Sequence, residues 1–278
     1  MFFSTPPDPL LIKPRRGWLY LDIREIWNFR ELLYFLTWRD VKLRYRQTLL
    51  GATWALLQPA LTLGIFTLFF GRLARIPSDG IPYPLFALGA LVPWNFFAHG
   101  LHQSSNSLIA SSHLITKVYF PRILIPLSSL LSGTIDLLLS FFLLLLLIAF
   151  YGNAPGSQVF SFPAFLALGF LTALGAGLWL SALNVQFRDV RYAVPFLIQV
   201  WFFLSPIVYP SSLVPEPWQP LYRLNPMVGV VEGFRFALLG SPAPTLSQWA
   251  ISGGGTALLL ISGIFYFRQV ERKFADII

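Results

Sequence analysis

Six stretches of this 278-residue chain are strongly apolar and nearly free of charge. The first follows a basic run, KLRYR at 42–46, and extends to Gly71 with no charged residue between 52 and 71. A helix of that length rises roughly 30 Å, which is the thickness of a bilayer's hydrocarbon core. The pattern therefore predicts six transmembrane helices, near 52–71, 83–103, 123–150, 162–185, 193–209 and 247–267.

Basic residues are distributed unevenly about these predicted spans. Sixteen of the twenty Lys and Arg residues lie in the N-terminal arm, in the loops 104–122 and 186–192, and in the C-terminal tail. The opposite side has only Arg72, Arg75, Arg223 and Arg235. Because loops rich in Lys and Arg stay in the cytoplasm, this asymmetry predicts that both termini are cytoplasmic.

The composition supports an integral membrane protein, with 55% hydrophobic and only 12% charged residues. The net charge of +8 is explained by membrane topology, so it does not indicate nucleic-acid binding. The N-terminus lacks the apolar core of a signal peptide. We therefore expect an all-α polytopic protein, with a cytoplasmic arm at 1–50 and a transmembrane domain at 51–278.

Two polar features stand out, one before the first expected span and one inside the third. Apolar residues recur at helical spacing among the charges of 23–45, which predicts an amphipathic helix at the membrane interface; a soluble helix packed on a partner is the alternative. Asp136 is the only acidic residue inside a predicted span. An intramembrane carboxylate indicates a functional site, and its alternative role is to fix helix packing.

The outer loop between the fifth and sixth spans contains a second, shorter apolar run, Met227–Leu239. This run is too short to span a bilayer, and it predicts either a re-entrant helical hairpin or a surface amphipathic helix. Asn225 and Pro226 favour a turn before a new helix, and Gly240 can end that helix. Glu232 and Arg235 stand three residues apart, so we expect each to bond the other or nearby backbone groups.

Motifs for reaction chemistry are missing from the sequence. No GxxxxGK[ST] occurs, so we expect no ATP site on this chain and no cofactor of its own. The chain lacks cysteine, which excludes thiolate chemistry, and it lacks a GxSxG elbow. His99, His102 and His113 lack a nearby carboxylate, so they indicate polar residues at a membrane boundary, with a metal site as the alternative. The sequence is that of a transport protein rather than an enzyme.

Three separated motifs resemble one family in order and spacing. They are WRDVKLRYRQTLLGATWALLQP at 38–59, VYFPRILIPLSS at 118–129 with Asp136 soon after, and LNPMVGVVEGFRFALLG at 224–240. Over nearly the whole chain they resemble the permease subunits of ABC-2 type polysaccharide exporters, the Wzm, KpsM and TagG class, which move O-antigen, capsule or teichoic acid.

The resemblance implies a six-span subunit of the bacterial inner membrane that forms a homodimer and binds two copies of a cytoplasmic ABC ATPase. ATP and Mg would bind to that partner ATPase. The substrate implied is an undecaprenyl-linked polysaccharide, moved from the cytoplasmic to the outer leaflet. The cytoplasmic loop with His113, Lys117, Tyr119 and Arg122 resembles the segment that contacts the ATPase. The 224–240 motif, with Asn225, Pro226, Glu232 and Arg235, resembles an outer gate.

A glycan conduit needs aromatic platforms and few strong charges, because strong charges would hold one sugar too tightly. Such residues occur on the two spans that the resemblance suggests line a channel. They are Trp54, Phe66, Phe69 and Phe70 in the first span and Trp201, Phe202, Phe203 and Tyr209 in the fifth. For any one of them, packing or lipid contact is the alternative.

Two other functions remain open. An ABC-2 permease for a drug or small lipid would share the fold, and identification of the bound substrate separates it from a glycan exporter. A membrane-embedded glycosyl- or acyltransferase would need clustered Asp or His at an interface, and the sequence offers no such cluster.

Overall fold

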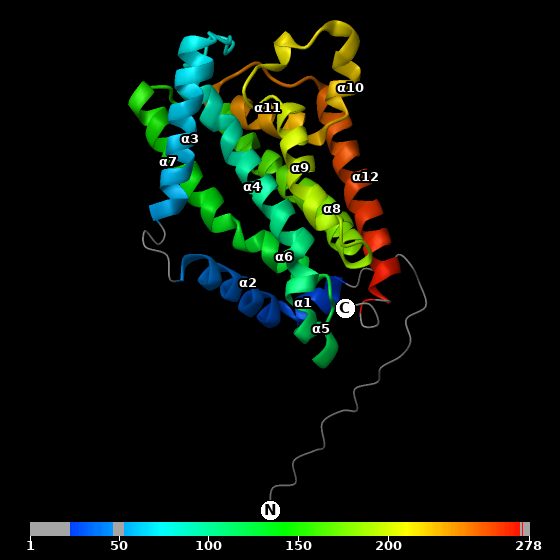
Figure 1. Ribbon diagram of the computed structural model, residues 1–278. Helices are drawn as coiled ribbons and strands as arrows, with labels where there is room; N and C mark the ends of the chain where they lie inside the picture. Colours follow the sequence, from blue (N-terminus) through cyan, green and yellow to red (C-terminus); the bar gives the residue numbers. More distant parts are fainter. Residues whose placement is uncertain (1–22, 47–52, 273, 275–278) are drawn as a thin grey trace, which may run out of the picture.

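The computed structural model describes residues 23–46, 53–272 and 274, and within these ranges the secondary structure is entirely helical (Figure 1). The first part of the predicted cytoplasmic arm, 1–22, lies outside the described residues. The α-helices, in chain order, are α1 (Ile23–Asn28), α2 (Arg30–Tyr45), α3 (Thr53–Phe66), α4 (Tyr83–Ala110), α5 (Ser112–Lys117), α6 (Leu124–Ser132), α7 (Thr134–Tyr151), α8 (Phe162–Gln186), α9 (Val190–Phe203), α10 (Gln219–Arg223), α11 (Pro226–Leu239) and α12 (Leu246–Glu271). A π-helical turn continues α3 through Thr67–Leu73, and 3-10 turns occupy Ser157–Ser161, Ser211–Leu213 and Glu216–Trp218.

Five helical segments in the described residues are long and apolar enough to cross a membrane. They are Thr53–Leu73, Tyr83–Ala110, Leu124–Tyr151, Ser157–Gln186 and Leu246–Glu271. They match five of the six predicted spans, and they confirm a multi-pass membrane protein. The predicted fifth span, 193–209, corresponds to α9, an apolar helix of only 14 residues that ends at Phe203. The six-span count therefore depends on α9.

The long helices stand side by side, and α4 and α8 form their centre (Figure 1). Large side chains on these two helices are fully buried, such as Phe86 and Phe97 of α4 and Phe165 of α8. By contrast, α3 lies at the edge of the bundle and buries little of its surface in this chain. The centre of the molecule is thus closely packed, while one flank keeps an apolar face without a partner among the described residues.

The cytoplasmic loop predicted at 104–122 is mostly helical, because α4 continues to Ala110 and α5 follows. Ser104 and Ser105 in this stretch are buried, and both make hydrogen bonds with neighbouring helices. Ser104 donates to the Pro126 carbonyl (3.0 Å), and Asn184 donates to the Ser105 carbonyl (2.8 Å). Those bonds let a serine-rich sequence extend a membrane helix.

Helices α8 and α12 approach each other closely along glycines. A Cβ on Gly175 would lie 2.7 Å from the Leu260 nitrogen, and a Cβ on Gly263 would lie 2.5 Å from the Gly175 oxygen. Small residues allow such backbone contact in membrane proteins, where association depends on close packing rather than on the hydrophobic effect. The close approach of α8 and α12 therefore depends on glycine at these positions.

We predict that Gly175→Ala destabilises the protein, because its new methyl meets backbone atoms that cannot rotate away. Overpacking of this kind typically costs about 1–3 kcal/mol. The control is Gly253→Ala in the partner helix α12, where an added Cβ meets nothing within 4 Å. In thermal melts of detergent-purified protein, Gly175→Ala should melt lower and Gly253→Ala should not. Equal melting temperatures would show that the helix pair tolerates separation.

Candidate functional site

One end of the helix bundle, predicted to be the outer one, is crossed by α11, which contacts α4, α8 and α12 (Figure 1). Its predicted boundaries are confirmed. Asn225 caps the N-terminus by accepting from the Met227 nitrogen (3.0 Å), and Gly240 ends the helix with φ of 74°, in the left-handed region that favours glycine. Close packing requires glycine inside α11 as well, since a Cβ on Gly233 would overlap the Phe165 ring.

Asn225 also joins α11 to the end of α9. Its side-chain oxygen accepts from the Trp201 indole nitrogen (2.8 Å), and its nitrogen donates to the Leu204 carbonyl (2.9 Å) and the Ser205 hydroxyl (3.0 Å). With the Met227 bond, the amide makes four hydrogen bonds, which is all that it can make. The position of α11 is therefore tied to the C-terminal end of α9.

Arg235 is fully buried and bonds backbone carbonyls of two other segments. Its guanidinium donates to the Phe86 carbonyl in α4 (3.1 Å) and to the Ile207 carbonyl after α9 (3.2 Å), and it lies 3.4 Å from the centre of the Phe86 ring. The expectation that Arg235 bonds backbone groups is met. No ion pair with Glu232 is formed among the described residues.

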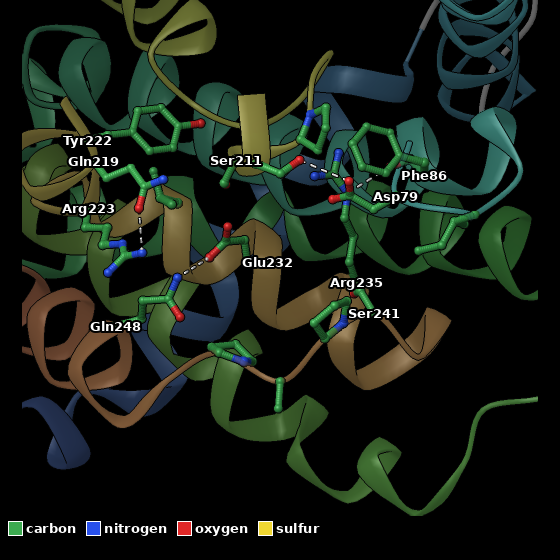
Figure 2. A pocket seen from close by; sticks show the side chains of 17 residues that line it. Asp79, Phe86, Ser211, Gln219, Tyr222, Arg223, Glu232, Arg235, Ser241 and Gln248 are labelled. Carbon is green, nitrogen blue, oxygen red and sulfur yellow. Dashed lines mark hydrogen bonds between the residues drawn. The ribbon is translucent and has the colours of Figure 1, made fainter. Parts of the chain in front are cut away.

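Glu232 lines a cavity beside α11, to which Arg235 also contributes (Figure 2). Its carboxylate accepts from the Gln248 side chain at 3.5 Å. Burial raises the pKa of Glu232 above its ordinary value. Both charged residues of the predicted gate therefore line this cavity, but only Arg235 also anchors the helix through bonds to backbone carbonyls.

Part of the predicted aromatic set is brought together where α3, α4 and α9 meet. Phe66 and Phe202 lie 6.1 Å apart, centre to centre, and Phe66 contacts Phe70. Two α4 residues that the sequence did not single out complete the cluster. Trp94 lies 5.5 Å from Phe202, and Phe97 lies 4.8 Å from Trp201.

The remaining aromatic candidates are exposed or lie near the outer end. Trp54, Phe69 and Phe203 are each more than half exposed in the single chain. Tyr209 is half-buried and donates to the Phe203 carbonyl (2.7 Å). These three rings lie at the surface of the single chain, whereas Phe66, Trp201 and Phe202 pack inward.

Asp136 lies toward the opposite end of the bundle, near the end of α2, the side that the sequence predicts to be cytoplasmic. It forms an ion pair with Arg44 and accepts a hydrogen bond from Tyr45, and Arg44 also bonds His99 in α4. The sequence marked Asp136 but gave it no partner. Basic residues on α2 were attributed to topology alone, although an acid in a span commonly pairs with a cation.

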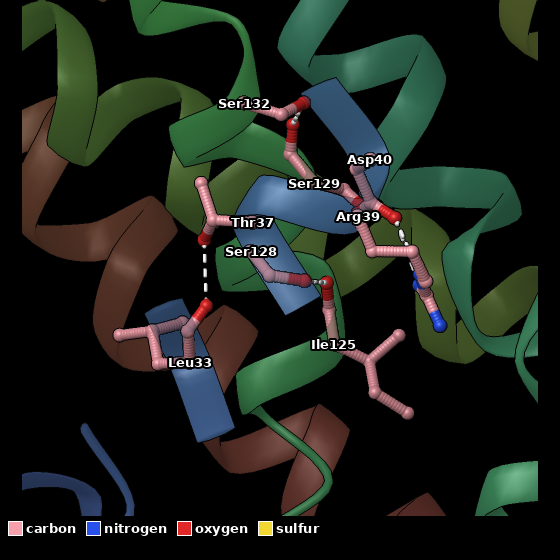
Figure 3. Close-up of polar contacts among 8 residues, drawn as sticks. All are labelled: Leu33, Thr37, Arg39, Asp40, Ile125, Ser128, Ser129 and Ser132. Atoms are coloured by element: carbon pink, nitrogen blue, oxygen red, sulfur yellow. Dashed lines mark hydrogen bonds and ion pairs between the residues drawn. The ribbon is translucent and has the colours of Figure 1, made fainter. Parts of the chain in front are cut away.

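A second set of polar contacts docks α2 on α6 (Figure 3). Asp40 pairs with Arg39 (2.8 Å) and accepts from the Ser129 hydroxyl (3.4 Å). Leu36 and Val41 of α2 are buried, whereas the large side chains at Tyr34, Phe35, Trp38 and Leu43 are exposed. The helix thus has one face on the bundle and another free face with exposed aromatic rings.

The four residues predicted to contact an ATPase divide into two groups. His113, Lys117 and Tyr119 are exposed on and after α5. Arg122 instead bonds within the chain, to the Glu271 carbonyl at the end of α12, and its backbone nitrogen donates to the Glu271 carboxylate (3.3 Å). Arg122 therefore attaches this segment to α12.

Comparison with known proteins decides the family. The family model described as ABC-2 type transporter matches residues 31–239, three quarters of the chain. The chain belongs to the ABC-2 type transporter family. The resemblance seen in its sequence motifs is thereby confirmed, and the ABC-2 domain includes α3, α9 and α11.

Several curated ABC-2 permeases are similar along most of their length. An O-antigen export system permease protein, RfbA, of Myxococcus xanthus is 29% identical over 257 residues, which cover 91% of this chain and 98% of the relative. RfbA of Klebsiella pneumoniae is 29% identical over 251 residues, 89% and 95% of the two chains. The polysialic acid transport protein KpsM of Escherichia coli is 26% identical over 207 residues, 72% and 78%.

We predict that Arg44 and Asp136 of this ABC-2 protein are energetically coupled. Their side chains are only 18% and 30% exposed, so Arg44→Ala leaves a poorly hydrated carboxylate without its cation. Arg44→Ala should lower the melting temperature, and Asp136→Asn in the same chain should restore part of it. The coupling energy expected from such a double-mutant cycle is about 0.5–3 kcal/mol.

The control cycle uses Arg39→Ala and Asp40→Asn, a pair whose arginine is 40% exposed. Exposed pairs contribute about 0.2–1 kcal/mol. A coupling no larger at Arg44 and Asp136 than in this control cycle would contradict an energetically important link.

Proposed function

We propose that this chain is the transmembrane subunit of an ABC exporter that moves a lipid-linked polysaccharide across the bacterial inner membrane. The observation that carries the proposal is the similarity to O-antigen export permeases over about nine tenths of the chain. The KpsM match extends the likeness to a second class of polysaccharide transport protein. An ABC-2 permease for a drug or small lipid would share the helices, but these long matches favour a glycan.

The proposed topology has six spans and cytoplasmic termini. As a helix of 14 residues, α9 reaches only roughly 21 Å, and the turn at 204–209 would complete the crossing. In this arrangement α2, α5 and the end of α12 face the cytoplasm, and α10 and α11 lie at the outer side. Because it is too short to span and is held among the outer ends of the helices, α11 would act as a re-entrant gate.

A second copy of the chain would complete the conduit. Exposed apolar residues lie along α3, including Leu61, Ile65 and Phe69, and along α9, including Phe196 and Phe203. These faces have the chemistry of a protein interface or of a channel wall with aromatic platforms. We place the channel between two copies, with Trp54, Phe69 and Phe203 as its aromatic candidates.

Two copies of a separate ABC ATPase would supply the energy, with ATP and Mg bound there. The exposed segment at His113, Lys117 and Tyr119 is the proposed contact. Arg122, through its bonds to Glu271, would transmit movement of this segment to α12.

We predict that deletion of this chain's gene removes surface polysaccharide and leaves lipid-linked polysaccharide inside the cell, and that the wild-type gene reverses both. Lys117→Glu should reduce surface polysaccharide and co-purification of the ATPase, because docking depends on local charge. Lys117→Arg keeps the charge and should behave as wild type. Unchanged surface polysaccharide after deletion, with no ATPase co-purified, would refute the proposed function.

We predict that Arg235→Ala impairs export more than Val230→Ile in the same helix. The alanine variant leaves two carbonyls without a charged donor, and hydrogen bonds to charged groups contribute about 1.5–3 kcal/mol each. Loss of one such bond therefore changes the equilibrium constant that it stabilises by roughly tenfold or more. Export rate and ion leak, followed with a potential-sensitive dye, are the measurements.

Glu232→Ala should also impair export, because that residue belongs to the same helix and faces the outer cavity. If both alanine variants are produced normally, export at the normal rate and cause no added leak, α11 is not the gate.

A further inference from the structure

A cavity of about 250 Å³ lies on the outer side of α11. Its walls come from α11, from 210–223 and from 241–248, and Asp79 stands at its edge (Figure 2). Asp79 and Ser212 are exposed, so the cavity reaches the surface, whereas Phe86 and Val228 give it an apolar floor. Several waters fit such a volume at about 30 Å³ each.

Unpartnered hydroxyl groups are concentrated at this cavity. Ser211, Tyr222 and Ser241 line it, and each has a buried hydroxyl oxygen that makes no hydrogen bond of ordinary geometry to a described residue, although Ser211 lies close to both Tyr222 and Glu232. Among all the residues that the structure describes, only one other hydroxyl, that of Thr67, is buried without such a hydrogen bond. A buried polar atom that lacks a partner is costly, so three around one space indicate that something polar occupies it.

The charges at the cavity are already compensated by the protein. Asp79 and Glu232 face Arg223 and Arg235, so the formal charges cancel. Asp79 accepts from Ser212 (3.0 Å) and Arg223 donates to Gln219 (3.0 Å), while Arg235 donates to backbone carbonyls. A bound anion would meet two carboxylates, and a bound cation would meet two guanidinium groups. A neutral molecule is therefore favoured.

The groups left over define that molecule's chemistry. Hydroxyls both donate and accept, and they match a ligand that also carries several hydroxyls. The aromatic ring of Tyr222 and the apolar floor suit the CH face of a sugar. Burial raises the pKa of Tyr222 above its ordinary value, so its hydroxyl keeps its proton.

We propose that this cavity is a binding site for one sugar residue of the exported glycan, placed on the outer side of the α11 gate. The inference rests on the proposed function, because it is the glycan that supplies the polyhydroxyl ligand. Binding must be weak enough for the chain to leave, as at any site along a conduit. A site here would hold the emerging glycan next to Glu232 both when α11 is displaced and when α11 closes the gate.

The test is saturation-transfer NMR on the permease–ATPase complex in lipid nanodiscs, since detergents with sugar head groups would compete. The probes are glucose, galactose, mannose, rhamnose and N-acetylglucosamine. At least one should give a saturable signal, and the triple variant Ser211→Ala, Tyr222→Phe and Ser241→Ala should weaken its binding at least fivefold. The variant removes only hydroxyls that make no hydrogen bond of ordinary geometry, so it should fold and melt like wild type.

The control is Tyr266→Phe, which removes a ring hydroxyl bonded to Gln186 in the cytoplasmic half of the chain (2.6 Å). It should leave sugar binding unchanged. No signal from any of the five sugars, or a signal that the triple variant retains, overturns the proposal. Calcium binding to the wild-type complex that Glu232→Gln abolishes would make this a cation site and would also overturn it.

Surface polysaccharide, measured in parallel in cells, distinguishes a failure of the proposed sugar site from a failure of the proposed function. Normal export by the wild-type chain without site-dependent sugar binding refutes the sugar site alone. Sugar binding by a chain whose deletion leaves surface polysaccharide unchanged refutes the proposed function instead.

Discussion

Polar groups buried among apolar helices must find partners within the protein, and the outer half of this molecule is arranged around that constraint. The chain turns at 204–209, where α9 has ended and backbone carbonyls lack helical donors. Asn225, Tyr83 and Arg235 supply donors, to the carbonyls of Leu204, Val208 and Ile207 respectively. Because two of these donors flank or belong to α11, the same bonds that satisfy the turn also fix the helix.

The opposite end of the bundle meets the same constraint with charges. Asp136 in α7 would be costly alone, and Arg44 reaches it from α2 while also bonding His99. The link connects α2 to two membrane-capable helices, α4 and α7. A movement of α2 would therefore disturb the pairing of the Asp136 carboxylate.

Much of the fold could be predicted from the sequence, since five spans, the α11 helix and its caps follow from hydrophobic runs and from Asn225, Pro226 and Gly240. Tertiary contacts explain what could not be predicted. The predicted span ends at 103, but bonds of Ser104 to α6 and of Ser105 to α8 accompany a helix that continues to Ala110. Likewise, Glu232 and Arg235 have the spacing of an ion pair, yet the carbonyls of Phe86 and Ile207, distant in sequence, bind the arginine instead.

The candidate site was predicted less completely for a similar reason. Residue type identified aromatic rings on α3 and α9, but it did not reveal that Trp94 and Phe97 of α4 draw Phe202 and Trp201 inward. Nor did it place Arg122 against Glu271. Inward packing of those rings fixes the end of α9 beside Asn225, to which Trp201 also donates a hydrogen bond. The exposed rings at Phe69 and Phe203 have no such packing role, and so they are the better candidates for the glycan contacts of the proposed function.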